Sequence, residues 1–85
     1  MYLHLGQNTV IRQKNIVGIF DLDSITVTER GREYIKKAEQ KGRVIYASME
    51  LPKSCVLWKE GKKERLYISQ LSAATLQKRM TKPFL

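Results

Sequence analysis

Short runs of apolar residues dominate the first twenty positions and predict β-strands. These runs cover residues 2–5, 9–12 and 16–20 and are separated by turn-forming residues. Side chains alternate across a strand. In the third run, this alternation places Ile16 and Phe20 on one face of the strand and Val17 and Ile19 on the other. We expect a hairpin or a sharp bend at residues 13–15 between the second and third runs. The strand formed by the third run needs apolar cover on both of its faces.

A helical pattern follows the third run. Apolar or small residues stand at positions 27, 31, 34, 35 and 38, the three- and four-residue spacing of one helix face. Thr26 and Glu29 have the spacing of a capping box, and Gly42 suits a left-handed cap at the other end. We therefore expect a long helix over about 27–41. A shorter helix is predicted near the C-terminus, where Ser72 is a suitable N-cap.

Three later runs predict further strands: 43–47, 55–59 and 65–68, the last two joined as a hairpin by an exposed turn at 60–64. The chain is thus predicted to be one small α+β domain over residues 1–80, with a mainly antiparallel sheet of five or six strands and a frayed tail at 81–85. One long and one short helix cover roughly one face of such a sheet. We therefore expect self-association, with an oligomer interface formed by Ile16, Val17, Ile19 and Phe20.

The charge of the chain indicates the class of ligand that it could bind. The 85 residues include 16 lysines and arginines against 8 acidic residues, a net charge of +8, and most of the excess lies after residue 50. Such a surface attracts polyanions, of which nucleic acid is the commonest inside cells. The candidate phosphate contacts are Arg12, Lys14, Lys53, Lys62, Lys63, Arg65, Lys78 and Arg79. Structural roles stay open, because lysines also protect sheet edges and basic residues complement the end of a helix.

Catalytic chemistry is poorly supported. His4 is the single histidine and has no ligand-type neighbours, and Asp21 and Asp23 suit a strand end. Cys55 lies in an apolar run without a candidate base, which indicates a buried, reduced thiol and a reducing compartment. No apolar run approaches the ~20 residues that span a membrane. We expect a cytoplasmic, non-enzymatic protein with no metal, no cofactor, no small-molecule substrate and no membrane association.

The segments YLHLG, NIVGIFDLD, PKSCVLW and YISQLSAATLQKR, arranged around a central helix, span nearly the whole chain. Together they resemble the RemA/RemB family of extracellular-matrix regulators, with the RemB branch nearest. The resemblance implies a DNA-binding regulator of biofilm matrix genes, with a fold similar to LytTR-type DNA-binding domains. It also implies homo-oligomeric rings whose basic outer surface bends or wraps DNA.

The same resemblance adds Asn15 to the candidate DNA contacts. In the RemA branch an arginine stands at this position, before the Ile-Ile or Ile-Val pair, and paired arginines stand where this chain has Leu51 and Pro52. The predicted function is therefore a homo-oligomeric regulator that binds double-stranded DNA through its phosphates and shape. The alternative is a protein-interaction module that docks an acidic partner or modulates a related regulator without binding DNA.

Overall fold

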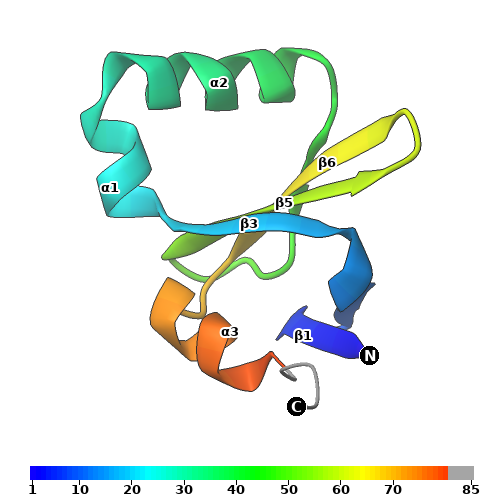
Figure 1. Ribbon diagram of the computed structural model, residues 1–85. Coiled ribbons are helices and arrows are strands. Elements are labelled where there is room, and N and C mark those ends of the chain that lie inside the picture. The colour runs from blue at the N-terminus through cyan, green and yellow to red at the C-terminus, as the bar shows by residue number, and fades with distance from the viewer. Residues whose placement is uncertain (81–85) are drawn as a thin grey trace.

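A computed structural model describes residues 1–80, and the predicted frayed tail at 81–85 lies outside the described residues (Figure 1). The elements are β1 (Tyr2–Gly6), β2 (Thr9–Arg12), a 3-10 turn η1 (Gln13–Asn15), β3 (Ile16–Asp21), α1 (Leu22–Val27), α2 (Glu29–Gln40), β4 (Val44–Tyr46), β5 (Ser54–Glu60), β6 (Lys63–Ser69) and α3 (Ala73–Arg79). The predicted α+β class is confirmed, and each predicted strand has a counterpart in the described chain.

The six strands form two sheets, so the prediction of a single sheet of five or six strands is wrong. β1 and β2 form an antiparallel pair, and the other four strands lie in the order β3-β5-β6-β4, with β4 parallel to β6. Of the two predicted connections between β2 and β3, the sharp bend is confirmed and the hairpin is not, because β2 pairs with β1 and η1 leads the chain into the larger sheet. The hairpin of β5 and β6 is confirmed, although its turn is shorter than predicted, at Gly61 and Lys62.

Both faces of the larger sheet are covered within one chain (Figure 1). One face packs against α1 and α2 through a cluster that includes Cys55, Leu66 and Ile68. The other face packs against β1–β2 and α3 through a cluster in which Leu5 and Leu76 are fully buried. β1 and β2 therefore cover the face of the larger sheet that the single-sheet prediction left open. Self-association is no longer needed to cover that face.

A β-bulge in β3 changes which residues face the core. Ile16 pairs with Trp58, but the next pair joins Gly18 to Leu57, so the register shifts at Val17. Ile16 and Ile19 consequently pack against the same cluster, contrary to the predicted alternation.

The predicted long helix is confirmed as α2 over Glu29–Gln40. The helix before it, α1, was not predicted, and the two helices meet at Thr28. This residue is extended, with φ −92° and ψ 149°, and its hydroxyl accepts a hydrogen bond of 3.0 Å from the Gly31 amide as the N-cap of α2. The predicted capping box of Thr26 and Glu29 is wrong, because the Thr26 hydroxyl donates to the Leu22 carbonyl inside α1 instead. The predicted cap at Gly42 is confirmed, because this residue has φ +68°. The predicted N-cap at Ser72 is also confirmed.

Two buried serines join the layers of the molecule. Ser54 and Ser69 are paired across β5 and β6, and neither is exposed. The Ser69 hydroxyl donates to the Leu5 carbonyl at 2.6 Å and accepts from the Leu71 amide at 3.0 Å. The Ser54 hydroxyl donates to the Leu71 carbonyl at 2.7 Å. This arrangement fixes β1 and the start of α3 to the end of the larger sheet.

We expect Ser69→Ala to lower the free energy of unfolding by about 2 to 3 kcal/mol, because it leaves a buried carbonyl and an amide without partners. Urea denaturation would measure this loss. Ser24→Ala is the matched control on an exposed position of α1, where the change should stay within about 0.5 kcal/mol. Equal stability of the two variants would contradict the role assigned to Ser69.

Candidate nucleic-acid interface

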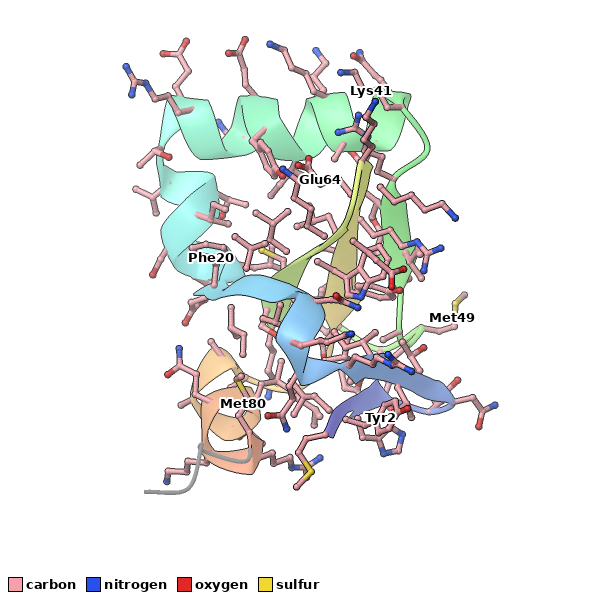
Figure 2. The ribbon with its side chains drawn as sticks, turned by 45° about the vertical axis from the view of Figure 1, so that its right-hand side comes forward. Tyr2, Phe20, Lys41, Met49, Glu64 and Met80 are labelled. Carbon is pink, nitrogen blue, oxygen red and sulfur yellow. The ribbon has the colours of Figure 1, made fainter. Side chains whose placement is uncertain are left out.

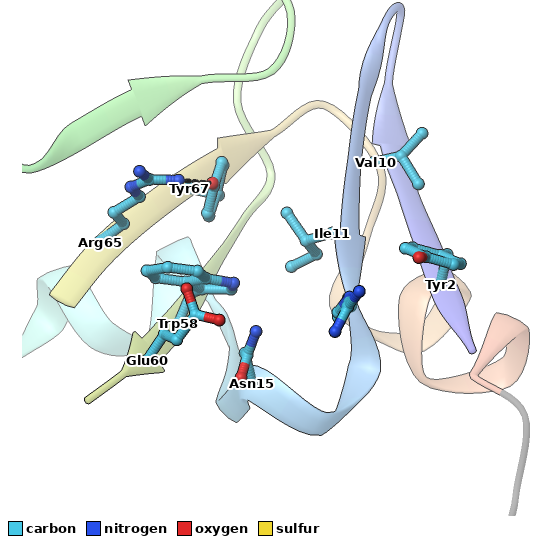
Figure 3. A pocket seen from close by; sticks show the side chains of 9 residues that line it. Tyr2, Val10, Ile11, Asn15, Trp58, Glu60, Arg65 and Tyr67 are labelled. Carbon is cyan, nitrogen blue, oxygen red and sulfur yellow. Dashed lines mark hydrogen bonds between the residues drawn. The ribbon is translucent and has the colours of Figure 1, made fainter. Parts of the chain in front are cut away.

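A hollow of about 230 Å³ lies between the β1–β2 pair and the β5–β6 hairpin (Figure 3). Its lining combines side chains from β2, η1, β5 and β6, among them Arg12, Asn15, Glu60 and Arg65. We call it the arginine pocket. It forms because η1 turns the chain from β2 into β3, which brings the bend at residues 13–15 beside the hairpin. Arg12 and Asn15, both predicted as DNA contacts, thus lie at one site with Arg65, a third predicted contact from a much later part of the chain.

Arg65 is held in place by aromatic side chains. Its guanidinium carbon lies 4.5 Å from the ring centroid of Trp58, and its Nη1 donates to the Tyr67 hydroxyl at 3.1 Å (Figure 3). Trp58 and Tyr67 are themselves buried and pack edge to face, with ring centroids 6.4 Å apart. A planar guanidinium fixed in this way loses little further freedom when it binds an anion.

Arg12 forms the opposite side of the pocket. Its guanidinium carbon lies 5.9 Å from the centroid of the exposed Tyr2 ring. Among the residues that the structure describes, neither Arg12 nor Arg65 forms an ion pair with a carboxylate. Glu60 also lines the pocket and partly offsets the two positive charges. The pocket therefore offers two guanidinium groups and one amide, groups that suit a phosphate oxygen.

The remaining predicted contacts lie in three places. Lys14 precedes Asn15 in η1, and Lys62 and Lys63 lie at the hairpin turn, so all three are near the arginine pocket. Lys53 lies at the opposite end of β5, about 20 Å away by strand length, where its amide donates to the Ser69 carbonyl. Lys78 and Arg79 form the last turn of α3, where they complement the helix end.

Sequence reasoning missed three further basic residues: Lys37, Lys41 and Arg43. They line a second hollow, of about 120 Å³, where the end of α2 meets the larger sheet. The spacing of four between the two lysines places them on one side of α2. That signal was available in the sequence, but the position of the helix end beside the hairpin was not.

The predicted oligomer interface is divided by the β-bulge. Ile16 and Ile19 pack inward, whereas Val17 and Phe20 are 60% and 42% exposed on a terminal strand of the larger sheet. A separate apolar hollow of about 350 Å³ lies beside β4, the other terminal strand, and includes Tyr46, Met49 and Pro52. Met49 points away from the sheet and is 93% exposed (Figure 2).

Residues 1–80 contain neither a cluster of metal ligands nor a helix that could span a membrane. No three histidine, cysteine or acidic side chains in this range gather as metal ligands would, and none of its helices has the length and apolar character needed to cross a membrane. Cys55 is buried, as predicted, and burial raises the pKa of its thiol to about 11. The thiol is therefore protonated at neutral pH and is a poor nucleophile.

Comparison with known proteins shows the family to which the chain belongs. The model of a family described as RemA-like, extracellular matrix regulatory protein A-like, matches residues 2–80. The chain belongs to the RemA-like family. Extracellular matrix regulatory protein B of Bacillus subtilis (strain 168) is 38% identical over 79 residues, which are 93% of this chain and 89% of that protein. The predicted RemA/RemB membership is confirmed, and the arginine pocket of this RemA-like chain lies within the matched residues.

Proposed function

We propose that this RemA-like chain is a non-enzymatic, cytoplasmic regulator of biofilm matrix genes that binds double-stranded DNA as a homo-oligomer. The observation that carries the proposal is the arginine pocket, where Arg12, Asn15 and Arg65 come together and, within residues 1–80, neither guanidinium has a carboxylate partner. Membership of an extracellular matrix regulator family supports the regulatory part. The net charge of +8 supports a polyanionic ligand.

The arginine pocket contacts the DNA backbone in this proposal, with the hairpin turn beside it. Lys14, Lys62 and Lys63 surround the pocket and add positive charge. Contacts to phosphates give affinity that depends on salt and carry no direct base information, so selectivity comes from DNA shape and bending. The family resemblance also implies a fold similar to LytTR-type DNA-binding domains, and this similarity stays a prediction.

Assembly uses the two terminal strands of the larger sheet. Val17 and Phe20 on β3 and the apolar hollow beside β4 are different surfaces at opposite edges of one sheet. A contact between unlike surfaces is heterologous, and it produces a ring when the rotation closes. A ring repeats the arginine pocket in every subunit, so avidity converts weak single contacts into useful affinity.

Light scattering after size exclusion and anisotropy titration of a labelled duplex test the two parts of this proposal. We expect an oligomer at micromolar concentration and an affinity for DNA that falls steeply between about 50 and 200 mM salt. A stable monomer would overturn the assembly. Absence of binding at the lower salt concentration would overturn the DNA-binding function.

The exposed apolar hollow beside β4 favours a second candidate function. Met49 and Leu51 are 93% and 79% exposed, an arrangement typical of a surface that docks another protein. A protein-interaction module would leave duplex DNA unbound at low salt and would retain a specific protein in a pull-down. Loss of that protein with Met49→Asp would assign its contact to this hollow.

A further inference from the structure

The hollow at the end of α2 is distinct from the arginine pocket. Three cations line it, Lys37, Lys41 and Arg43, above a floor that includes Tyr34 and Ala38. We call it the α2 hollow. Figure 2 shows Lys41 at the end of the helix and Glu64 on the sheet below it. Its volume of about 120 Å³ suits a single phosphate group and its water rather than a larger organic ligand.

Arg43 is fixed at the mouth of the α2 hollow. Its amide donates to the Ala38 carbonyl and its carbonyl accepts from the Leu66 amide, both at 2.9 Å. Its guanidinium forms an ion pair of 3.1 Å with Glu64, and the Arg43 side chain remains 40% exposed. The other guanidinium donors can therefore meet a ligand without a large rearrangement.

The two lysines lack the partner that Arg43 has. They stand one helical turn apart, and like charges at this spacing cost a helix about 0.2 to 0.5 kcal/mol. Within residues 1–80, neither forms an ion pair with a carboxylate. The helix dipole offsets part of this repulsion, and a bound anion would remove it. With Glu64 counted, the residues around the hollow carry a net charge of +2.

The α2 hollow and the arginine pocket lie on opposite faces of one hairpin. Arg65 contributes to the arginine pocket, whereas its neighbour Glu64 points to the other face and pairs with Arg43. Both residues stand only two or three positions from the turn at Gly61 and Lys62. Two strand residues span about 7 Å, and the DNA major groove is about 8.5 Å deep and wide enough for a two-stranded ribbon.

We infer that the α2 hollow is a second phosphate-diester site, so that one subunit places its β5–β6 hairpin in the major groove and contacts the DNA backbone on both sides of it. The arginine pocket contacts one row of phosphates, and Lys37, Lys41 and Arg43 contact the other. This inference rests on the proposed DNA-binding function and extends it to residues that no comparison assigns.

The test removes charge from the α2 hollow and measures salt dependence. The variant carries Lys37→Gln and Lys41→Gln, and anisotropy titrations with a labelled duplex are repeated at several salt concentrations. Loss of two phosphate contacts should lower the slope of log affinity against log salt by about 1.8. The matched control carries Arg30→Gln and Lys36→Gln, which remove the same charge from the same helix but do not line the hollow.

The outcomes separate the site from general attraction and from the proposed function. The inference is supported when the hollow variant loses slope and the control keeps the wild-type slope. Equal losses in the two variants, or no loss in either, would overturn the second site while leaving DNA binding in place. Failure of the wild-type protein to bind the duplex would overturn both proposals. Circular dichroism melting of each variant verifies that it is folded.

Discussion

Gly31→Ala is expected to lower the free energy of unfolding by about 4 kcal/mol or more, a large part of the stability of a domain of this size. A Cβ atom at this position would lie 1.8 Å from the carbonyl oxygen of Ile25, which belongs to the backbone of α1. No side-chain rotation relieves that overlap, so α1 and α2 would have to separate. Far-UV circular dichroism and urea denaturation would measure the loss.

Gly42→Ala is the matched control, because it adds the same methyl group at a different kind of glycine. Gly42 has a φ of +68°, and an added Cβ would meet no atom within 4 Å. The expected loss is therefore only the conformational cost of about 1 kcal/mol. If the two variants were equally stable, close packing of α1 on α2 would not be the reason for glycine at position 31.

Replacing both pocket arginines, Arg12→Gln with Arg65→Gln, is expected to weaken duplex binding by roughly 100-fold and to lower the salt slope by about 2. Each guanidinium has no carboxylate partner in the described chain and is therefore available to a phosphate. Loss of stacking on Trp58 adds to the effect of Arg65→Gln. Anisotropy titration at two salt concentrations would measure both quantities.

Two further variants test whether the pocket itself is responsible. Glu60→Gln removes the carboxylate from the same pocket and should strengthen binding, since repulsion of phosphate is lost. Lys78→Gln with Arg79→Gln removes two charges from α3, away from the pocket, and should change the affinity much less. Equal weakening by the α3 pair and the arginine pair would contradict a specific role for the pocket.

Features set by local chemistry were predictable from the sequence. The strand runs, the cap at Gly42 and the cap at Ser72 depend on a few neighbouring residues, and all are present. The helix α1 was missed, and the cap of α2 was placed at Thr26 instead of Thr28, because Thr26 also has a plausible capping pattern. The bulge at Val17 was missed because it depends on the pairing of β3 with β5, which no local pattern specifies.

The candidate site was predictable only in part for the same reason. Arg12, Lys14 and Arg65 stood out because they lie at a bend or a hairpin, where charge is conspicuous in the sequence. The convergence of Arg12 and Arg65 on one pocket required β2 to pair with β1 and η1 to turn toward the hairpin. Lys37 and Lys41 resemble the solvated face of any surface helix, and only the packing of α2 gives them a common hollow.

The hydrogen bond from Ser69 to the Leu5 carbonyl has a consequence for the order of folding during synthesis. It joins residues 64 positions apart, one in β1 and one in β6. The first strand to leave the ribosome therefore cannot dock onto the larger sheet until β6 has emerged. The arginine pocket lies between these early and late segments. Competence to bind DNA is therefore expected only in chains whose translation has passed β6, and incomplete chains should not compete for the same sites.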